Sequence, residues 1–141
     1  MLEENVRKGI VLIIINDKGK YLLLIQRNDN LYSFISGGCE LGETESDTVV
    51  REAKEETGLK IDRSKLTDTG KFIRFVGGSK GPAQQEVFLY KVDDDNNVIE
   101  TEDTNEIKGY EWCSEGEVVV KLAGKTPLIK LFQDLKESKL I

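Results

Sequence analysis

The sequence predicts a layered α/β sandwich that forms one domain over residues 1–141. A length of 141 residues is typical of a single domain, and surface scaling for this mass indicates that about two-thirds of the chain's surface is buried on folding. Strand-like segments are interleaved with segments of helical periodicity. Because we find no repeat, linker or low-complexity tract, we expect one domain from end to end.

The first two predicted strands form a hairpin. Residues 6–15 are rich in β-branched side chains, and residues 21–25 are apolar again after the tight-turn sequence Asn16-Asp17-Lys18-Gly19. A polar stretch then precedes another apolar run at residues 31–35. The sequence Ser36-Gly37-Gly38 that follows predicts an irregular loop, since two glycines free the backbone there.

A helix of about three to four turns is predicted between Thr44 and Gly58. Val49 and Ala53 fall on one helical face, which indicates the side that packs on the core. Thr44 and Asp47 have the spacing of a capping box, and Gly58 stands where a helix C-terminus favours a left-handed residue.

Strand patterns return after this helix. Residues 71–76 and 86–92 are predicted strands, and a glycine-containing loop at residues 77–82 separates them. The acidic run at residues 93–97 is typical of a solvated turn. It lacks the glycine and the late glutamate that a calcium-binding loop needs at fixed offsets.

The last part of the chain predicts a strand and two helices. Residues 106–112 form the strand, and residues 115–122 form a short helix. An amphipathic terminal helix follows, with Thr126 as its N-cap and Pro127 at its first helical position.

The composition excludes several kinds of catalytic site. The chain has no histidine, which removes imidazole-activated nucleophiles, imidazole acid/base catalysis and the common zinc sites. A net charge of −6 argues against a broad basic surface for nucleic acid or anionic lipid. Cys39 and Cys113 lie far apart and form no CxxC motif, so we expect reduced thiols.

Nothing in the sequence predicts a membrane segment. The longest apolar run, residues 10–15, is too short to span a bilayer, and residues 1–4 lack the pattern of a secretory signal peptide. We therefore expect a soluble cytoplasmic protein without a membrane partner.

The candidate functional residues are three glutamates of the predicted helix. Glu52, Glu55 and Glu56 fall within about 100° of arc on one face. Like charges at these spacings repel, and Mg²⁺, which prefers oxygen ligands, offsets such repulsion. Glycines just before the helix let backbone carbonyl groups approach the same point. The alternative is a solvated acidic face with Lys54 and Lys60 as ion-pair partners.

The segment that contains these glutamates resembles the signature of the Nudix (MutT-like) hydrolases. Gly37 is followed after five residues by Glu43, and after seven more by Arg51-Glu52-Ala53-Lys54-Glu55-Glu56-Thr57-Gly58-Leu59. The resemblance is specific because all the fixed positions of the signature agree at once. The family often has Pro-Gly-Gly at the entry to this segment, where this chain has Ile35-Ser36-Gly37. Outside the signature the resemblance is looser, but it spans nearly the whole chain.

The resemblance implies a Nudix-type α/β/α sandwich with a mixed β-sheet between helices. It implies that Glu52, Glu55 and Glu56 are catalytic residues and ligands of Mg²⁺, with Mn²⁺ as an alternative. Glu52 or Glu56 would orient or deprotonate the attacking water. Mg²⁺ would neutralise the diphosphate, acidify the water and stabilise the leaving phosphate, so no histidine is required.

The resemblance also assigns roles to the loop before the helix. Gly37 would offer its carbonyl oxygen to a metal ion, and Glu40 would support the metal through water. Arg51, which belongs to the catalytic segment, would pair with Glu43 and hold the loop against the helix.

Four residues outside the signature match positions that contact the nucleotide in MutT-like relatives. They are Arg27, Phe34, Asn105 and Glu106. The alternatives are a surface salt bridge for Arg27 and a core aromatic for Phe34, and Glu86 is a weaker candidate for the role of Glu106.

The function implied is a Mg²⁺-dependent pyrophosphohydrolase that cleaves a nucleoside diphosphate linked to another moiety. A nucleoside triphosphate, including an oxidised one, is the favoured substrate, and the products would be a nucleoside monophosphate and pyrophosphate. The alternatives are hydrolysis of ADP-ribose, a dinucleoside polyphosphate or a sugar nucleotide, and a nucleotide-sensing module without catalysis. We expect a small-molecule nucleotide and no nucleic acid as partner, and analogy with relatives leaves a homodimer open.

Overall fold

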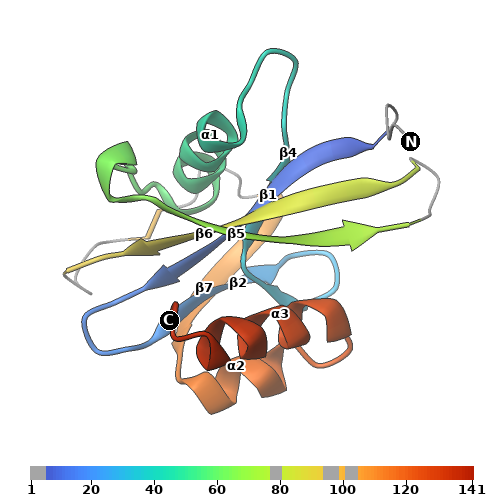
Figure 1. The fold of residues 1–141 in the computed structure, drawn as a ribbon. Coiled ribbons are helices and arrows are strands. Elements are labelled where there is room, and N and C mark those ends of the chain that lie inside the picture. Colours follow the sequence, from blue (N-terminus) through green and yellow to red (C-terminus); the bar gives the residue numbers. More distant parts are fainter. Residues whose placement is uncertain (1–5, 77–80, 94–98, 101–104) are drawn as a thin grey trace.

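A mixed β-sheet lies between two helical layers in the computed structural model, which describes residues 6–76, 81–93, 99–100 and 105–141 (Figure 1). Helix α1 (Glu45–Thr57) covers one face of the sheet. Helices α2 (Glu115–Lys121) and α3 (Thr126–Glu137) cover the other face. This arrangement confirms the predicted α/β/α sandwich.

The sheet is built around its first strand. Its strands within the described residues are β1 (Arg7–Ile15), β2 (Tyr21–Gln26), β3 (Tyr32–Ser33), β4 (Ile35–Gly38), β5 (Thr67–Phe75), β6 (Ala83–Lys91) and β7 (Ile107–Cys113). β1 pairs in parallel with β6 and antiparallel with β2 and β4. β5 pairs with β6, while β3 and β7 pair with β2, all antiparallel.

Each face of the sheet has its own apolar core, because side chains alternate along a strand. Ile10 and Leu12 of β1 are fully buried against Val49 of α1. Val11 and Ile13 point the other way and pack with Phe132 of α3. The core position predicted for Val49 is therefore confirmed.

Residues 36–38 continue a strand rather than forming the predicted irregular loop. Gly37 and Gly38 pair with Ile10 and Gly9 of β1. A Cβ atom on Gly9 would lie 2.6 Å from the carbonyl oxygen of Gly37. The glycines in this region thus serve a close approach of two backbones, which the sequence pattern does not distinguish from loop flexibility.

The N-cap predicted for the terminal helix is wrong by one residue. Lys125 occupies the N-cap position, and Thr126 is already helical. No side chain caps this end; instead, the Lys125 Nζ donates to the Tyr32 carbonyl oxygen over 2.6 Å. This contact ties the helix start to β3, while no side-chain oxygen accepts from the first N–H groups of the helix.

The two long strands of the second half begin earlier than predicted, at Thr67 and Ala83. A register shift interrupts the β5–β6 pairing after Asp68, where Gly70 has a φ of 73°. This bulge hides the strand's period from the sequence pattern. Residues 77–80 and 94–98, which hold most of the predicted loop and of the acidic run, lie outside the described residues.

Over the described ranges, no helix is long and apolar enough to cross a membrane.

The thiol of Cys113 predicts a loss of stability at alkaline pH. Burial, together with a hydrogen bond to Glu111, raises its pKa from 9.0 to about 12. A raised folded-state pKa contributes stability that is present below pH 9 and is lost as the pH rises towards 12. We expect the free energy of unfolding to fall more steeply over this range in the wild type than in Cys113→Ala. Urea titrations at several pH values measure it, and parallel curves would contradict the prediction.

Candidate active site

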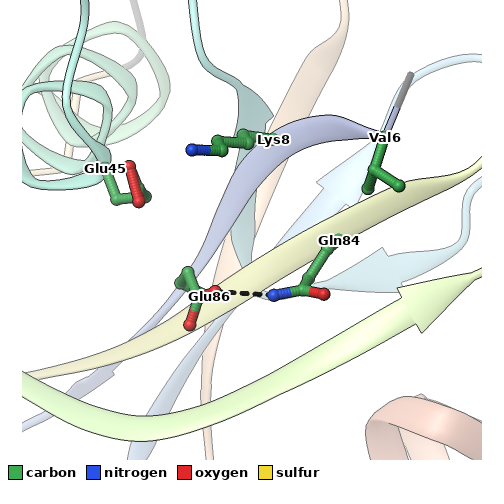
Figure 2. Close-up of a pocket in the computed structure, with 5 residues that line it drawn as sticks. All are labelled: Val6, Lys8, Glu45, Gln84 and Glu86. Atoms are coloured by element: carbon green, nitrogen blue, oxygen red, sulfur yellow. Dashed lines mark hydrogen bonds between the residues drawn. The ribbon is translucent and has the colours of Figure 1, made fainter. Parts of the chain in front are cut away.

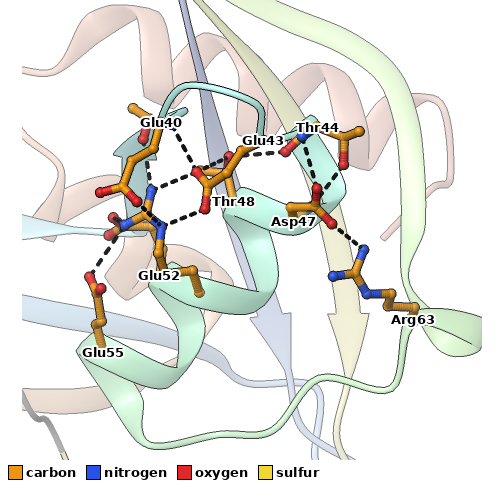
Figure 3. A network of polar contacts seen from close by, with 10 residues as sticks. Glu40, Glu43, Thr44, Asp47, Thr48, Glu52, Glu55 and Arg63 are labelled. Atoms are coloured by element: carbon orange, nitrogen blue, oxygen red, sulfur yellow. Dashed lines mark hydrogen bonds and ion pairs between the residues drawn. The ribbon is translucent and has the colours of Figure 1, made fainter.

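Helix α1 starts and ends as its sequence predicts. Thr44 and Asp47 form a reciprocal capping box, with backbone to side-chain distances of 3.0 and 3.1 Å. Gly58 closes the helix with a φ of 73°. Arg63, in the short 3₁₀ helix Arg63–Lys65, adds an ion pair of 2.8 Å to Asp47 (Figure 3). These caps fix the position of α1 and therefore of its glutamates.

The guanidinium group of Arg51 joins the carboxylates of Glu43, Glu52 and Glu55, which Figure 3 labels. Its Nε and Nη2 donate to the two carboxylate oxygens of Glu43 over 2.7 and 2.9 Å. Its Nη1 donates to Glu52 over 2.7 Å and to Glu55 over 3.5 Å. Its Nη2 also donates to the carbonyl oxygen of Gly38 over 2.9 Å. One side chain thus connects the loop, the end of β4 and the acidic side of α1.

Glu43 anchors the loop in front of the helix. Besides Arg51, its carboxylate accepts hydrogen bonds from the Glu40 backbone N–H over 2.8 Å and from the Thr48 hydroxyl over 3.0 Å. These hydrogen bonds, that of Arg51 first, lower the pKa of Glu43 to about 2. The carboxylate of Glu40 lies 3.5 Å from the Arg51 Nε but is mostly exposed. The loop therefore holds Glu43 as a fixed anion, with Glu40 at its rim.

Glu52 is enclosed between α1 and β4. Its side chain is only 14% exposed, and burial raises its pKa, while the hydrogen bond and charge of Arg51 act in the opposite direction. The Glu52 carboxyl group packs on the bare α-carbon of Gly37, since a Cβ there would lie 2.6 Å from Glu52 Oε1. Glycine is thus required at position 37 by the side chain of Glu52.

Two adjacent glycines offer a matched test of this contact. We expect Gly37→Ala to displace the Glu52 carboxyl group and to lower activity at least tenfold, because a shift of about 1 Å at a catalytic group costs on the order of 100-fold. Gly38→Ala is the control, since the nearest atom to its Cβ would be the Lys8 carbonyl oxygen at 3.9 Å. Steady-state rates of both variants measure the effect. Equal activities would show that Glu52 does not depend on Gly37.

Glu56 faces away from Arg51 and is 7% exposed. Its side chain lies next to that of Glu52, and this contact lowers the pKa of Glu52, against the larger effect of burial. The alternative of a solvated acidic face is therefore wrong for Glu52 and Glu56. A solvated acidic face describes Glu55 better, because its side chain is 43% exposed. The cation 3.5 Å from Glu55 is nevertheless Arg51 and not a lysine.

The glutamates suit a hard divalent cation in their chemistry, but their side chains do not yet converge on one point. Within the ranges that the structure describes, no three acidic or cysteine side chains are placed to hold a metal ion. Arg51 draws Glu52 and Glu55 towards the loop, whereas Glu56 adjoins Glu52 from the other side. All the donor atoms are oxygens, as Mg²⁺ prefers. A common ion would share the Glu52 carboxylate with Arg51, which donates to its Oε1.

Of the nucleotide contacts predicted outside the helix, Phe34 is corrected by the structure. It is 1% exposed and packs against Phe132, 6.1 Å away between ring centroids. The core-aromatic alternative is the one observed. The backbone N–H of Arg27 donates to the carbonyl oxygen of Glu106 over 2.7 Å, and Asn105 precedes Glu106 on the surface. These three residues lie together at the start of β7.

Glu86 lines a separate cavity of about 230 Å³ near the first turn of α1, shown in Figure 2. The side chains drawn there are Val6, Lys8, Glu45, Gln84 and Glu86. Gln84 donates to Glu86 over 2.9 Å. Glu86 pairs with Ile10 on β1, which pairs with Gly37 on its other side. One strand therefore separates Glu86 from the place where Glu52 packs.

Sequence reasoning missed Tyr110, which lies beside Glu56. Both residues line a cavity of about 220 Å³. Tyr110 pairs with Leu24 of β2, so its ring points to the face covered by α1, and it is 44% exposed. The signal available in the sequence was an aromatic residue two positions before Trp112 in a predicted strand. A register shift at Ile25 kept the sequence from showing which face it occupies.

The comparisons with known proteins agree with this architecture. The profile of the NUDIX domain matches residues 6–135. An RNA pyrophosphohydrolase of Ruthia magnifica subsp. Calyptogena magnifica is 34% identical over 73 residues, which cover 51% of this chain. The matched segment spans only 41% of that relative.

Two solved structures are similar over nearly their whole length. The MutT protein from Methanosarcina mazei Go1 superposes with a TM-score of 0.79 and 20% identity, covering 99% of both chains. A C. elegans Ap4A hydrolase in a binary complex gives a TM-score of 0.77 and 19% identity, covering 96% of this chain and 98% of that one. At these identities the likeness concerns the fold.

Proposed function

Because the chain belongs to the NUDIX domain family, we propose that it is a metal-dependent pyrophosphohydrolase of nucleotides. The observation that carries the proposal is the placement of Glu52 between Gly37, Arg51 and Glu56. Three glutamates on one helix side repel one another, and a bound divalent cation would offset that repulsion, whereas a purely structural helix face gains nothing from it.

Members of this family generally use divalent metal ions, and we propose that Glu52, Glu55 and Glu56 hold Mg²⁺ here, or Mn²⁺ in its place. The chemistry that such an ion supplies when bound is neutralisation of the phosphates and a lower pKa of the attacking water. Glu40 is proposed to complete this site through water, whereas the Gly37 carbonyl oxygen, implied as a ligand by the resemblance, faces Gly9 of β1 in this structure.

In the proposed reaction, the oxygen of a water molecule attacks one phosphorus of the diphosphate. The bond from that phosphorus to the bridging oxygen breaks, and the proton of the water passes to the carboxylate of Glu52 or Glu56. Arg51 positions Glu52 and, through Glu43 and Gly38, the end of β4. Arg51 and Glu43 thus act on the reaction by positioning.

For the substrate, we propose a nucleoside triphosphate that yields the monophosphate and pyrophosphate. The relatives' names support a phosphoanhydride substrate attached to a nucleotide, as one is an RNA pyrophosphohydrolase and another an Ap4A hydrolase. Arg27, Asn105 and Glu106 lie next to Ile107, which lines the cavity beside Glu56. We propose that they contact the substrate from the start of β7.

A substrate screen tests the proposal. Purified protein with Mg²⁺ is incubated with nucleoside triphosphates, oxidised triphosphates, ADP-ribose, Ap4A, sugar nucleotides and a triphosphorylated RNA oligonucleotide, and the products are identified. Release of pyrophosphate and a monophosphate from a nucleoside triphosphate supports it. Cleavage confined to another class redirects the substrate assignment. Tight nucleotide binding without hydrolysis in the presence of Mg²⁺ or Mn²⁺ would indicate a nucleotide-sensing module instead of a hydrolase.

A further inference from the structure

The cavity beside Glu56 has one polar end and apolar walls. It lies between α1 and the strands β2 and β7, with a volume of about 220 Å³. Leu24 and Ile107 form its sheet side and are almost completely buried, and the half-buried Ile99 adds a further apolar wall. Glu56 brings a carboxyl group into this lining. The cavity is thus an apolar slot that reaches the proposed catalytic carboxylates.

Tyr110 is the aromatic member of this lining. In register with Leu24, it stands on the α1 face of the sheet, yet 44% of it is exposed. The neighbouring side chains on that face, Leu24 and Ile107, are buried instead. A large ring left open to solvent beside an apolar slot is a surface on which a planar group can stack.

The size of the cavity limits what fits inside it. A protein cavity of about 150 Å³ accommodates benzene, so 220 Å³ suits a planar heterocycle but not a whole nucleotide. A ligand whose ring fills the slot must therefore place its sugar and phosphates outside. Glu56, which both lines the slot and contacts Glu52, marks the direction in which the phosphates lie.

We propose that this slot binds the base of the substrate nucleotide, stacked on Tyr110. The proposal rests on the proposed function and adds the part of the substrate that the slot recognises. It makes Tyr110 a specificity-determining residue, because a substrate without a planar ring gains nothing from the contact. Phosphates attached to the base through the sugar then extend past Glu56 to Glu52.

Paired substrates test the proposal. We expect Tyr110→Ala to raise KM for the best-cleaved nucleoside triphosphate by roughly 5- to 100-fold, the effect of losing one aromatic–base stack. Hydrolysis of inorganic tripolyphosphate, which has no base, should change less than twofold. Tyr110→Phe, which retains the ring, should behave as the wild type. Phe72→Ala on β5 is the control, because this aromatic is 52% exposed and lies outside the slot.

Binding without catalysis separates this proposal from the proposed function. Calorimetric titration with the corresponding nucleoside monophosphate in EDTA should show the same 5- to 100-fold loss for Tyr110→Ala. If the wild type cleaves no nucleotide but binds one through Tyr110, the hydrolase assignment fails and the base slot stands. Unchanged binding in Tyr110→Ala, or an equal loss with nucleotide and tripolyphosphate, would overturn the slot.

Discussion

Glu56→Gln is expected to lower kcat by about 100- to 10,000-fold while the fold persists, the range for removing a positioned acid/base group or metal ligand. The fold is preserved because glutamine has nearly the same shape as glutamate, and its amide can donate a hydrogen bond to the neighbouring Glu52 carboxylate. The substitution also removes one of several like charges from the helix. Loss of turnover is therefore separated from loss of structure.

The matched control for this variant is Glu45→Gln. Glu45 is the first residue of the same helix and, by helical periodicity, lies on the same side as Glu56, about 16 Å away along the axis. We expect Glu45→Gln to retain activity within a few-fold. Steady-state rates at saturating Mg²⁺ and thermal unfolding with and without Mg²⁺ measure both variants. A wild-type kcat in Glu56→Gln would remove Glu56 from the catalytic residues.

The signature helix was predictable because its signals are local. The capping box of Thr44 and Asp47, the left-handed Gly58 and the buried face of Val49 each follow from residues a few positions apart. The acidic side of the helix follows from the same periodicity. What periodicity could not show is that Arg51 gathers Glu43 and Glu52 around itself, since that depends on how the loop folds back.

Residues on the sheet were harder to assign, because their face depends on pairing with distant strands. Phe34 packs on Phe132, a residue nearly a hundred positions away. Tyr110 points to the slot because of its register with Leu24, and a bulge alters that register two residues earlier. A shift of one residue moves a side chain to the other face of a sheet. Substrate contacts on strands therefore could not be read from the sequence, whereas contacts on the helix could.

The glycines illustrate the same limit. Gly37 was predicted to free the backbone of a loop, but it lies in a strand and makes room for the Glu52 carboxyl group. Gly9, which the sequence did not single out, is required by the carbonyl oxygen of Gly37. A missing side chain has the same appearance in a sequence whether it allows a turn or a close contact.

Arg51→Ala is expected to be the most destabilising substitution in the site. It leaves Glu43, Glu52 and Glu55 without their shared cation and the Gly38 carbonyl oxygen without its donor. Removing one partner of a buried ion pair costs about 3–5 kcal/mol. Because the Arg51 side chain is 22% exposed, we expect about 1–3 kcal/mol after allowance for solvent screening. Urea titration of the free energy of unfolding measures it.

Two further variants test whether the loss of stability in Arg51→Ala comes from the missing shape of the guanidinium group or from its missing charge. Arg51→Lys keeps the charge but lacks the planar fork that makes two hydrogen bonds to Glu43, so we expect it to recover less than half of the loss. Arg63→Ala breaks an exposed pair with Asp47 and should cost less than about 1 kcal/mol. Full recovery in Arg51→Lys would show that charge alone matters.

Mg²⁺ provides the last test, because it competes with Arg51 for Glu52. In the wild type, an ion that binds Glu52 must share its carboxylate with the guanidinium group, whose positive charge opposes that binding. In Arg51→Ala the guanidinium group no longer offsets the repulsion between the carboxylates. Saturating Mg²⁺ is therefore expected to stabilise Arg51→Ala more than the wild type, measured as the shift in Tm. An equal shift would mean that Arg51 and the metal do not share Glu52.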